Sequence, residues 1–453
     1  MERISSGSPN REETHKANQH LEALVASLEQ KEPVLTAAVL QLARGGLETV
    51  RQRFGREGAT PLAYHNEAHT AAVLERVATQ LAMVSRAVGP VLQGYGASSE
   101  LAQMILAEVF KPRLVGLALV AAAWHDAQQQ GEMKGVPQSA ENERILGVRG
   151  RFERFVGANE QLSALEAARA LLKQDPEGKV FSIDDREKLA ARIDAIFGQT
   201  AEGAEPALPN LADGEARQRV EALAEELARR DDDVGFVVRS IVATTPAWDK
   251  EHNTVVQSHL DKLRHPLEFL LPLADLGEAI QTQNARSLLR TGFLLRFEEY
   301  PDLREALQRA LWEGGSPKEQ KAAACAVVQD VIRGQSAFWE GQSKLLDAPN
   351  GAVSLLAQAL AQEFAKTRTL AQTLPGVAGG EYLKSRLPGD VFPYLRLFQF
   401  NAITRALSNL VWWGGARALA PFDLQGHLVR EIKQFLEGLD LGFGAQQQRD
   451  RHS

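Results

Sequence analysis

The stretch Tyr64-His65-Asn66-Glu67-Ala68-His69 decides the predicted fold, because it places two imidazoles at the head of a long apolar pattern. No Gly or Pro interrupts the chain from Leu62 to Val88, and apolar residues recur there at helical spacing, at Val73, Val77, Leu81, Val84 and Val88. Side chains four residues apart lie one above the other on a helix. We therefore expect one helix whose buried face begins with His65 and His69.

Two further polar groups interrupt apolar segments. His125 and Asp126 end an almost wholly apolar helix, and Asp275 lies within the apolar run from Phe269 to Leu276. One histidine on an apolar face is usually an ordinary core histidine, but a buried carboxylate without a cation costs several kcal/mol. Histidine and aspartate side chains that face one helical core are the ligands that a hard-to-borderline divalent cation needs.

Composition limits the class of protein. The chain has 453 residues with 44% hydrophobic and 24% charged residues, which suits a globular protein with one large or two medium domains. A net charge of −7 argues against a non-specific nucleic-acid surface, which needs a basic face. Residues that favour helices dominate, so we predict an all-α protein. The single cysteine, Cys325, excludes an internal disulfide and is interpreted as a small buried hydrophobe.

The breaks in the pattern divide the chain into three parts. We predict a disordered tail over residues 1–17, a helical domain over 18–347 and a C-terminal helical region over 348–453, with the boundary at the Pro/Gly break after residue 346. No apolar run resembles a signal peptide, and the longest apolar stretch, Leu114 to Trp124, is shorter than the roughly 20 residues that span a bilayer. We therefore expect a cytoplasmic protein with no membrane partner.

Three local predictions bear on the site. The polar stretch from Gln128 to Gln138 is predicted to be a loop, the stretch from His252 to Leu263 a helix, and the stretch from Glu319 to Leu346 one long helix. Loops beside ligand-bearing helices are where substrate contacts are often placed.

The ordered set Tyr64-His65-Asn66-x-x-His69, His125-Asp126 and Asp275 resembles the HD-domain superfamily of metal-dependent phosphohydrolases. Its first element is similar to that of the class I cyclic nucleotide phosphodiesterases. The stretches Ala243-Thr244-Thr245-Pro246 and Ala274-Asp275-Leu276-Gly277 are also similar to small bacterial HD proteins. The resemblance covers about residues 63–342 and implies a phosphodiesterase-like helical core.

The resemblance also implies site roles. It implies that one divalent ion is bound by His69, His125, Asp126 and Asp275. It implies that His65 is a general acid that protonates the leaving oxygen while a metal-activated water attacks the phosphate. The substrate would be a nucleotide or another small phosphate ester. The ion is not identified among Mn, Mg, Fe, Co, Ni and Zn. Tyr64 and Asn66 would support these groups or contact substrate, or they are structural.

The chain departs from the phosphodiesterase pattern after the His-Asp pair. Gln129 stands where that family has a histidine near a second metal, and a glutamine is a poorer ligand, so a second ion is in doubt. The histidines between Asp126 and Asp275 have polar neighbours, and we interpret them as surface residues; they are His252, His259 and His265.

Several residues are candidates for substrate contacts. Gln342, close to Phe338 and Trp339, loosely matches the base-holding glutamine of the phosphodiesterases, although helix packing also explains it. Three cationic residues are candidates for contact with phosphate: Lys134, Arg296 and Arg333. Glu141 is a candidate for contact with the water.

Two other functions stay open. In the first, the site holds metal and nucleotide without hydrolysis and passes the bound state to a partner through the C-terminal helices. In the second, the chain belongs to the di-iron oxygenase branch of the same helical core, which needs ligands for two irons. The aromatic cluster around Trp412 and Trp413 is interpreted as core packing or as a self-association face, which would make a homo-oligomer.

Overall fold

The computed structural model describes residues 22–94, 98–198, 207–281 and 285–310, with single positions between 326 and 360. Helices dominate this part of the chain, as the composition predicts. The tail over 1–17 and nearly all of the C-terminal region, including Trp412 and Trp413, lie outside the described residues, as does Cys325. No described helix is long and apolar enough to cross a membrane.

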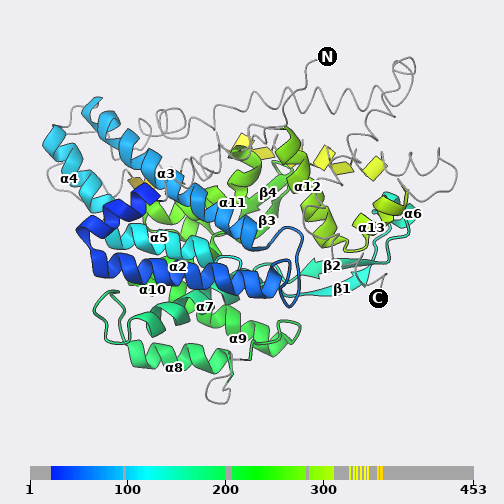
Figure 1. Cartoon of the computed structure of the whole chain (residues 1–453), viewed down its shortest axis with the longest axis horizontal. Coiled ribbons are helices and arrows are strands. Elements are labelled where there is room, and N and C mark those ends of the chain that lie inside the picture. Colours follow the sequence, from blue (N-terminus) through cyan, green and yellow to red (C-terminus); the bar gives the residue numbers. More distant parts are fainter. Residues whose placement is uncertain are drawn as a thin grey trace, which may run out of the picture.

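The helices follow one another along the chain, and two short hairpins lie in the connections between them (Figure 1). Their bounds are α2 (Pro33–Phe54), α3 (Glu67–Gly94), α4 (Ser99–Val109), α5 (Pro112–Trp124), α6 (Glu141–Ile145), α7 (Ala158–Gln174), α8 (Arg186–Ile196), α9 (Gly214–Ala228), α10 (Asp233–Val242), α11 (Leu270–Gln281), α12 (Ala285–Glu299) and α13 (Leu303–Gln308). Two 3₁₀ turns, η1 (Leu260–Lys262) and η2 (Pro266–Phe269), precede α11.

Helix α5 is the centre of the main core. Every residue from Val115 to Trp124 is buried, as expected for a helix that is apolar on all faces. It packs against α2, α3, α7 and α10 (Figure 1). The Trp124 indole donates a hydrogen bond of 2.9 Å to the Leu42 carbonyl on α2, so its one polar atom is satisfied inside the core.

A smaller core joins α12 and α13 to the segment around α6. It contains Phe293, Phe297, Tyr300 and Leu307 together with Ala140 and Val148. Helix α12 therefore packs beside the chain that follows the His125-Asp126 pair. The division at residue 347 stays a prediction, and the described residues Leu356 and Leu360 belong to the main core.

Two local predictions were wrong, and both concern short hairpins. Strand β1 (Gly131–Gly135) lies in the predicted loop and pairs antiparallel with β2 (Gly150–Arg154). Strands β3 (Pro246–Asp249) and β4 (Thr254–Gln257) pair where a helix was predicted from His252. Hairpins are stabilised by cross-strand contacts, which a search for helical periodicity does not detect.

The helix predicted over residues 319–346 agrees with the structure where it is described, because every described position between 326 and 345 is helical.

The start of α3 also differs from the prediction. The helix begins at Glu67, and His65 lies in the bend that precedes it. The Asn66 side chain explains the boundary, because its Oδ1 accepts hydrogen bonds from the backbone N–H groups of Ala68 (3.0 Å) and His69 (3.3 Å). His65 and His69 therefore belong to different local structures.

Helices α2 and α5 approach most closely at Gly46, which gives a test of the core. A Cβ at Gly46 would lie 2.5 Å from the Ala123 carbonyl oxygen, whereas at Gly45 its nearest neighbour would be Trp124 Cζ2 at 3.6 Å. Alanine improves helix propensity equally at both positions, by about 0.5–1 kcal/mol. We expect Gly46→Ala to lower the free energy of unfolding by about 1–3 kcal/mol through overpacking.

The control Gly45→Ala should leave the free energy of unfolding unchanged or raise it. Urea denaturation followed by circular dichroism measures both variants. Equal effects of the two substitutions would contradict the close approach of α2 and α5.

Candidate functional site

Four side chains from three helical segments meet beside the main core. His69 is in the first turn of α3, His125 and Asp126 directly follow α5, and Asp275 is on α11. The Nε2 atom of His69 lies 3.4 Å from Asp126 Oδ2 and 3.3 Å from Asp275 Oδ1. The Nε2 atom of His125 lies 3.2 Å and 3.7 Å from the same two oxygens. The structure thus brings together the four residues expected to bind metal.

The spacing of these atoms suits a shared cation. Ligand atoms that bind one ion at about 2.1 Å lie roughly 3.0–3.4 Å apart in tetrahedral or octahedral geometry. The observed separations of 3.2–3.7 Å fall in or near that range. His69, His125 and Asp275 offer ligand atoms that all lie within 4.8 Å of one another, so this cluster could hold a metal ion.

The hydrogen bonds of His125 and Asp126 support the same interpretation. His125 Nδ1 is 2.8 Å from the Ala122 carbonyl and donates to it, which leaves Nε2 as the ligand atom. Both His125 Nε2 and Asp126 Oδ2 are buried without a hydrogen-bond partner. Buried polar atoms that are left without such partners are unusual and need a further interaction. A cation between them would provide it.

Without a cation, the cluster is held by attraction between imidazole and carboxylate. Burial alone would lower the pKa of His125, but Asp126, whose Oδ2 lies 3.2 Å from Nε2, and then the charge of Asp275 raise it above its usual range. Burial alone would raise the pKa of Asp126, but His125, His65 and His69 bring it well below its usual range. Below the raised pKa of His125, a metal ion would have to displace a proton from this histidine.

Gln129 contacts Asp126 directly. Its buried side chain donates a hydrogen bond of 2.8 Å from Nε2 to Asp126 Oδ1. One carboxylate oxygen of Asp126 is therefore engaged, and Oδ2 faces the two imidazoles. Among the described residues, one group has metal-ligand spacing; it consists of His69, His125 and Asp275 and does not include Asp126.

The remaining candidate histidines hold local contacts elsewhere. His252 Nδ1 lies 2.8 Å from Asp249 across the β3–β4 turn. His265 accepts a hydrogen bond from the Leu267 N–H and caps η2. His259 is partly buried, and burial followed by the charge of Lys262 lowers its pKa. None of the three is part of the metal-ligand cluster.

His65 lies next to the cluster and is fixed by a carboxylate from α12. Its Nδ1 is 2.5 Å from Glu298 Oε1, and Glu298 Oε2 accepts the backbone N–H groups of Tyr64 and His65 at 3.0 and 2.9 Å. Its Nε2 is 2.8 Å from Arg154 Nη1. A guanidinium can only donate, so Nε2 accepts here and Nδ1 carries the hydrogen that is donated to Glu298.

Glu298 is an unusually acidic buried carboxyl. Burial alone would raise its pKa, but the charge of His65, the hydrogen bonds from His65 and the charge of Arg154 lower the pKa to about 2. Glu298 is therefore ionised throughout the physiological range. An ionised carboxylate at Nδ1 fixes the orientation of the imidazole.

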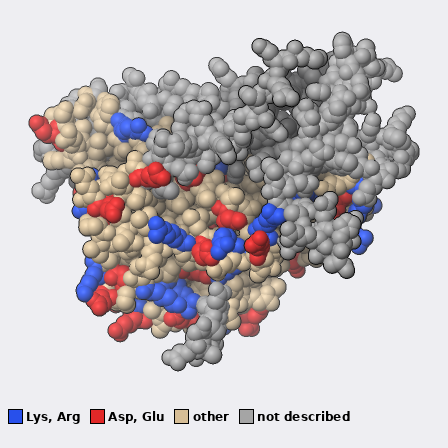
Figure 2. Space-filling model, in the orientation of Figure 1, with Lys and Arg blue, Asp and Glu red and all other residues tan. Residues whose placement is uncertain are grey.

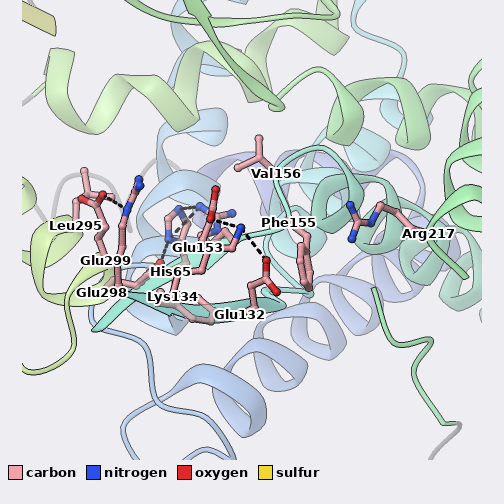
Figure 3. Close-up of a pocket in the computed structure, with 13 residues that line it drawn as sticks. His65, Glu132, Lys134, Glu153, Phe155, Val156, Arg217, Leu295, Glu298 and Glu299 are labelled. Carbon is pink, nitrogen blue, oxygen red and sulfur yellow. Dashed lines mark hydrogen bonds and ion pairs between the residues drawn. The ribbon is translucent and has the colours of Figure 1, made fainter. Parts of the chain in front are cut away.

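His65 and Glu298 form one end of a pocket of about 630 Å³ (Figure 3). The β1–β2 hairpin lines it through Glu132, Lys134 and Glu153, and Phe155 and Arg217 lie at the end opposite His65. This volume falls within the range of about 300–1,000 Å³ that is usual for small-molecule sites. On the described part of the face shown in Figure 2, acidic and basic side chains are interspersed.

The residues proposed as substrate contacts have different positions. Lys134 lines the pocket and is half exposed, but it pairs with Glu132 at 2.9 Å and Glu153 at 2.6 Å. Tyr64 places its ring 4.8 Å from that of His65 and 4.4 Å from that of His69, so it packs against both. Asn66 is the helix cap described above.

Gln342 is not among the residues that line this pocket. It is buried, and its side-chain amide donates to the Val255 carbonyl and to Thr254 Oγ1 on β4. This contact agrees with the alternative interpretation that it is a packing residue. The other cations form local pairs, Arg296 with Glu143 and Glu299 and Arg333 with Asp330. Glu141 is the first residue of α6.

Sequence reasoning did not find Glu298 or Arg154. Glu298 lies in an ordinary amphipathic helix 233 positions after His65, and nothing in its neighbourhood marks it. Arg154 ends a strand that was not predicted.

No protein-family model matches the chain, and neither a curated protein nor a solved structure matches it significantly.

The raised pKa of His125 predicts that metal binding is coupled to proton release. Below that pKa, a cation competes with the proton on His125, so the apparent affinity should rise by about tenfold per pH unit and level off above it. Calorimetric titration with Zn²⁺ or Mn²⁺ in buffers of different ionisation enthalpy measures the protons released. The control His252→Ala should bind metal like the wild type. Binding without proton release, at an affinity independent of pH from 6 to 8, would contradict this coupling.

The lowered pKa of Glu298 predicts a loss of stability in acid. Its folded-state pKa of about 2 lies below the ordinary value of 4.5, so its contribution is complete above pH 4.5 and is lost as the pH falls toward 2. This contribution is of the order of 3 kcal/mol. We expect Glu298→Gln to be less stable than the wild type at pH 7, with the difference shrinking below pH 4.5.

Urea unfolding between pH 3 and pH 7 checks the Glu298 prediction. The control Glu299→Gln removes a neighbouring, more exposed carboxylate and should give a smaller difference with little pH dependence. A difference for Glu298→Gln that stays constant over this range would show that the carboxyl does not titrate as described.

Proposed function

We propose that the protein is an HD-type metal-dependent phosphohydrolase that hydrolyses a small phosphate ester, with nucleotides among the candidates. One observation carries the proposal: His65, oriented by the buried Glu298, lines the pocket, and its ring also lies near that of His69 in the His/Asp cluster. The rings of His65 and His69 are 5.7 Å apart, so one histidine can serve the pocket while the other serves the cluster. This division of roles is the one that the sequence resemblance implies.

The His/Asp cluster would hold one divalent ion through His69, His125, Asp126 and Asp275. When bound, such an ion supplies Lewis-acid stabilisation of phosphoryl charge and lowers the pKa of water. Two imidazole nitrogens and carboxylate oxygens suit several ions, and Mn, Fe, Co, Ni and Zn all accept this mixed set, with Mg less suited to imidazole. The amide of Gln129 on Asp126 favours one ion rather than two.

His65 would move the proton that hydrolysis requires. Water would release one proton to the solvent when it attacks the phosphoryl group, the leaving oxygen would gain one from His65 when its bond to phosphorus breaks, and His65 would then regain a proton from the solvent. In this proposal Nε2 of His65 donates to the leaving oxygen while Nδ1–H stays bonded to Glu298. The anionic Glu298 keeps Nε2 pointed into the pocket.

The runner-up is a protein that binds metal and a phosphorylated ligand without turnover. The amide of Gln129 on Asp126 favours it, because this contact limits the number of ions that the carboxylate can hold. A di-iron oxygenase is disfavoured, because the described residues hold one cluster with metal-ligand spacing where that chemistry needs ligands for two irons.

The proposed function is tested with the full-length protein and a panel of phosphate mono- and diesters. Each ester is incubated with Mn²⁺, Co²⁺, Ni²⁺, Zn²⁺ or Mg²⁺, and released phosphate or alcohol is measured beside the metal content. Hydrolysis with at least one ion is expected. No hydrolysis under any condition, together with no bound ion, would falsify the proposal. A nucleotide recovered intact from a tight complex would favour the binding protein instead.

The two histidines should respond differently to substitution. His69→Ala should lower metal content and activity together, because three ligands make a poorer site. His65→Ala should keep the metal and slow turnover by about 10²–10⁴-fold, the usual contribution of a general acid. A nitrophenyl ester needs little protonation and should be slowed less. Equal metal loss in the two variants would make His65 a ligand and contradict the assigned roles.

A further inference from the structure

Of the four cations that line the pocket, Lys134 and Arg151 are neutralised by pocket carboxylates, and Arg217 lies over the Phe155 ring and donates from Nε to the Leu211 carbonyl. Lys134 is held between Glu132 and Glu153. Arg151 pairs with Glu299 through a contact of 2.8 Å. A phosphate would have to compete with these carboxylates for either cation, so neither is well placed to bind an incoming anion.

Arg154 differs from Lys134 and Arg151 because its shortest contact is with a ring nitrogen of His65 and not with a carboxylate. Its Nη1 donates to His65 Nε2 at 2.8 Å, and its Nη2 reaches Glu160 Oε1 at 3.3 Å, a long contact for an ion pair. The other oxygen of Glu160 accepts the Gly157 N–H at 2.6 Å. The Nε atom of Arg154 is buried and has no hydrogen-bond partner. The N–H groups of this guanidinium are therefore only partly engaged in hydrogen bonds.

The contact between Arg154 and His65 is incompatible with the proposed proton transfer. The lone pair of Nε2 that accepts from Arg154 is the place where a transferable proton would have to sit. A phosphate in the pocket would offer the guanidinium a charged acceptor with matching bidentate geometry. Hydrogen bonds to an ionised acceptor are roughly twice as strong as those between neutral groups. An anion beside His65 should therefore draw Arg154 away from Nε2.

We propose that Arg154 is the phosphate-binding residue of this pocket and that it releases Nε2 of His65 when it binds the anion. The proposal rests on the proposed function for the role of His65, but it adds a residue and a substrate-dependent step. Arg154 holds the imidazole until a phosphoryl group arrives. The phosphate and the free Nε2 then lie side by side at the same end of the pocket, next to the His/Asp cluster.

The binding test uses inorganic phosphate as the probe and the full-length protein as purified. Isothermal titration compares the wild type with Arg154→Gln and with the control Arg151→Gln, which removes the same charge from the same pocket. We expect Arg154→Gln to weaken phosphate binding by about 10- to 100-fold, the worth of one or two charge-assisted hydrogen bonds. Arg151→Gln should change it by less than about threefold, since Arg151 is committed to Glu299.

Arg154→Lys keeps the charge but loses the planar pair of N–H donors, so its phosphate affinity should lie between those of the wild type and Arg154→Gln. If Arg154→Gln does not fold, Arg154→Lys carries the test, and phosphate affinity equal to that of the wild type would contradict a bidentate anchor. Equal losses in Arg154→Gln and Arg151→Gln would overturn the proposal, because they would indicate a general charge effect.

The release of His65 is followed by nuclear magnetic resonance of ¹⁵N-labelled histidines, with the His65 signals assigned from a His65→Asn sample. In the wild type, phosphate should shift the Nε2 resonance of His65 with the concentration dependence found by calorimetry. In Arg154→Gln, the resonance should start at a different position and respond little. An Nε2 resonance that stays fixed at saturating phosphate in the wild type would overturn the release step.

These measurements separate the inference from the proposed function, because they require no turnover. If phosphate binding depends on Arg154 but the protein hydrolyses no ester, Arg154 remains the phosphate-binding residue and the proposed hydrolase function is wrong. If Arg154→Gln hydrolyses esters with an unchanged KM, the hydrolase function stands and the role of Arg154 in phosphate binding is wrong. The expected kinetic result is a raised KM for every ester.

Discussion

Polar groups buried at the end of a fully apolar helix are the constraint on which the site depends. Helix α5 has no polar face, so the residues that follow Trp124 are delivered into the core beside α3 and α11. His125 and Asp126 then need partners there, because buried charge is costly unless it is compensated. His69 and Asp275 provide them from neighbouring helices. The close approach of α2 to α5 at Gly46 keeps this helix in place.

The part of the fold that follows helical periodicity could be predicted from the sequence. The positions of α5 and α11, and with them the convergence of His125 and Asp275, follow from apolar runs that contain one polar group. The bend at His65 could not be predicted from periodicity, because the capping side chain of Asn66 overrides it. The hairpin that bears Arg154 depends on pairing between segments that are far apart in the chain. Glu298 is recognised only through a contact made after folding.

The neighbours of Asp126 and His65 differ in kind, and under the proposed function this difference separates cation binding from proton transfer. Asp126 is surrounded by neutral or positive donors, the amide of Gln129 and the imidazoles, so it stays anionic. His65 has an anion at one nitrogen and a cation at the other, so its two nitrogens are distinguished by charge. The first arrangement suits the capture of a cation, and the second suits a directed transfer of a proton.

The distance along the chain between His65 and Glu298 also sets the order in which the site can be completed during synthesis. All four members of the His/Asp cluster have been translated once α11 has emerged from the ribosome, whereas Glu298 follows on α12. Domains fold as their N-terminal parts appear. A nascent chain that ends within the α11–α12 connection therefore carries every residue of the cluster but lacks the carboxylate that orients His65. The residues of the His/Asp cluster can therefore come together before the carboxylate that orients His65 has been synthesised.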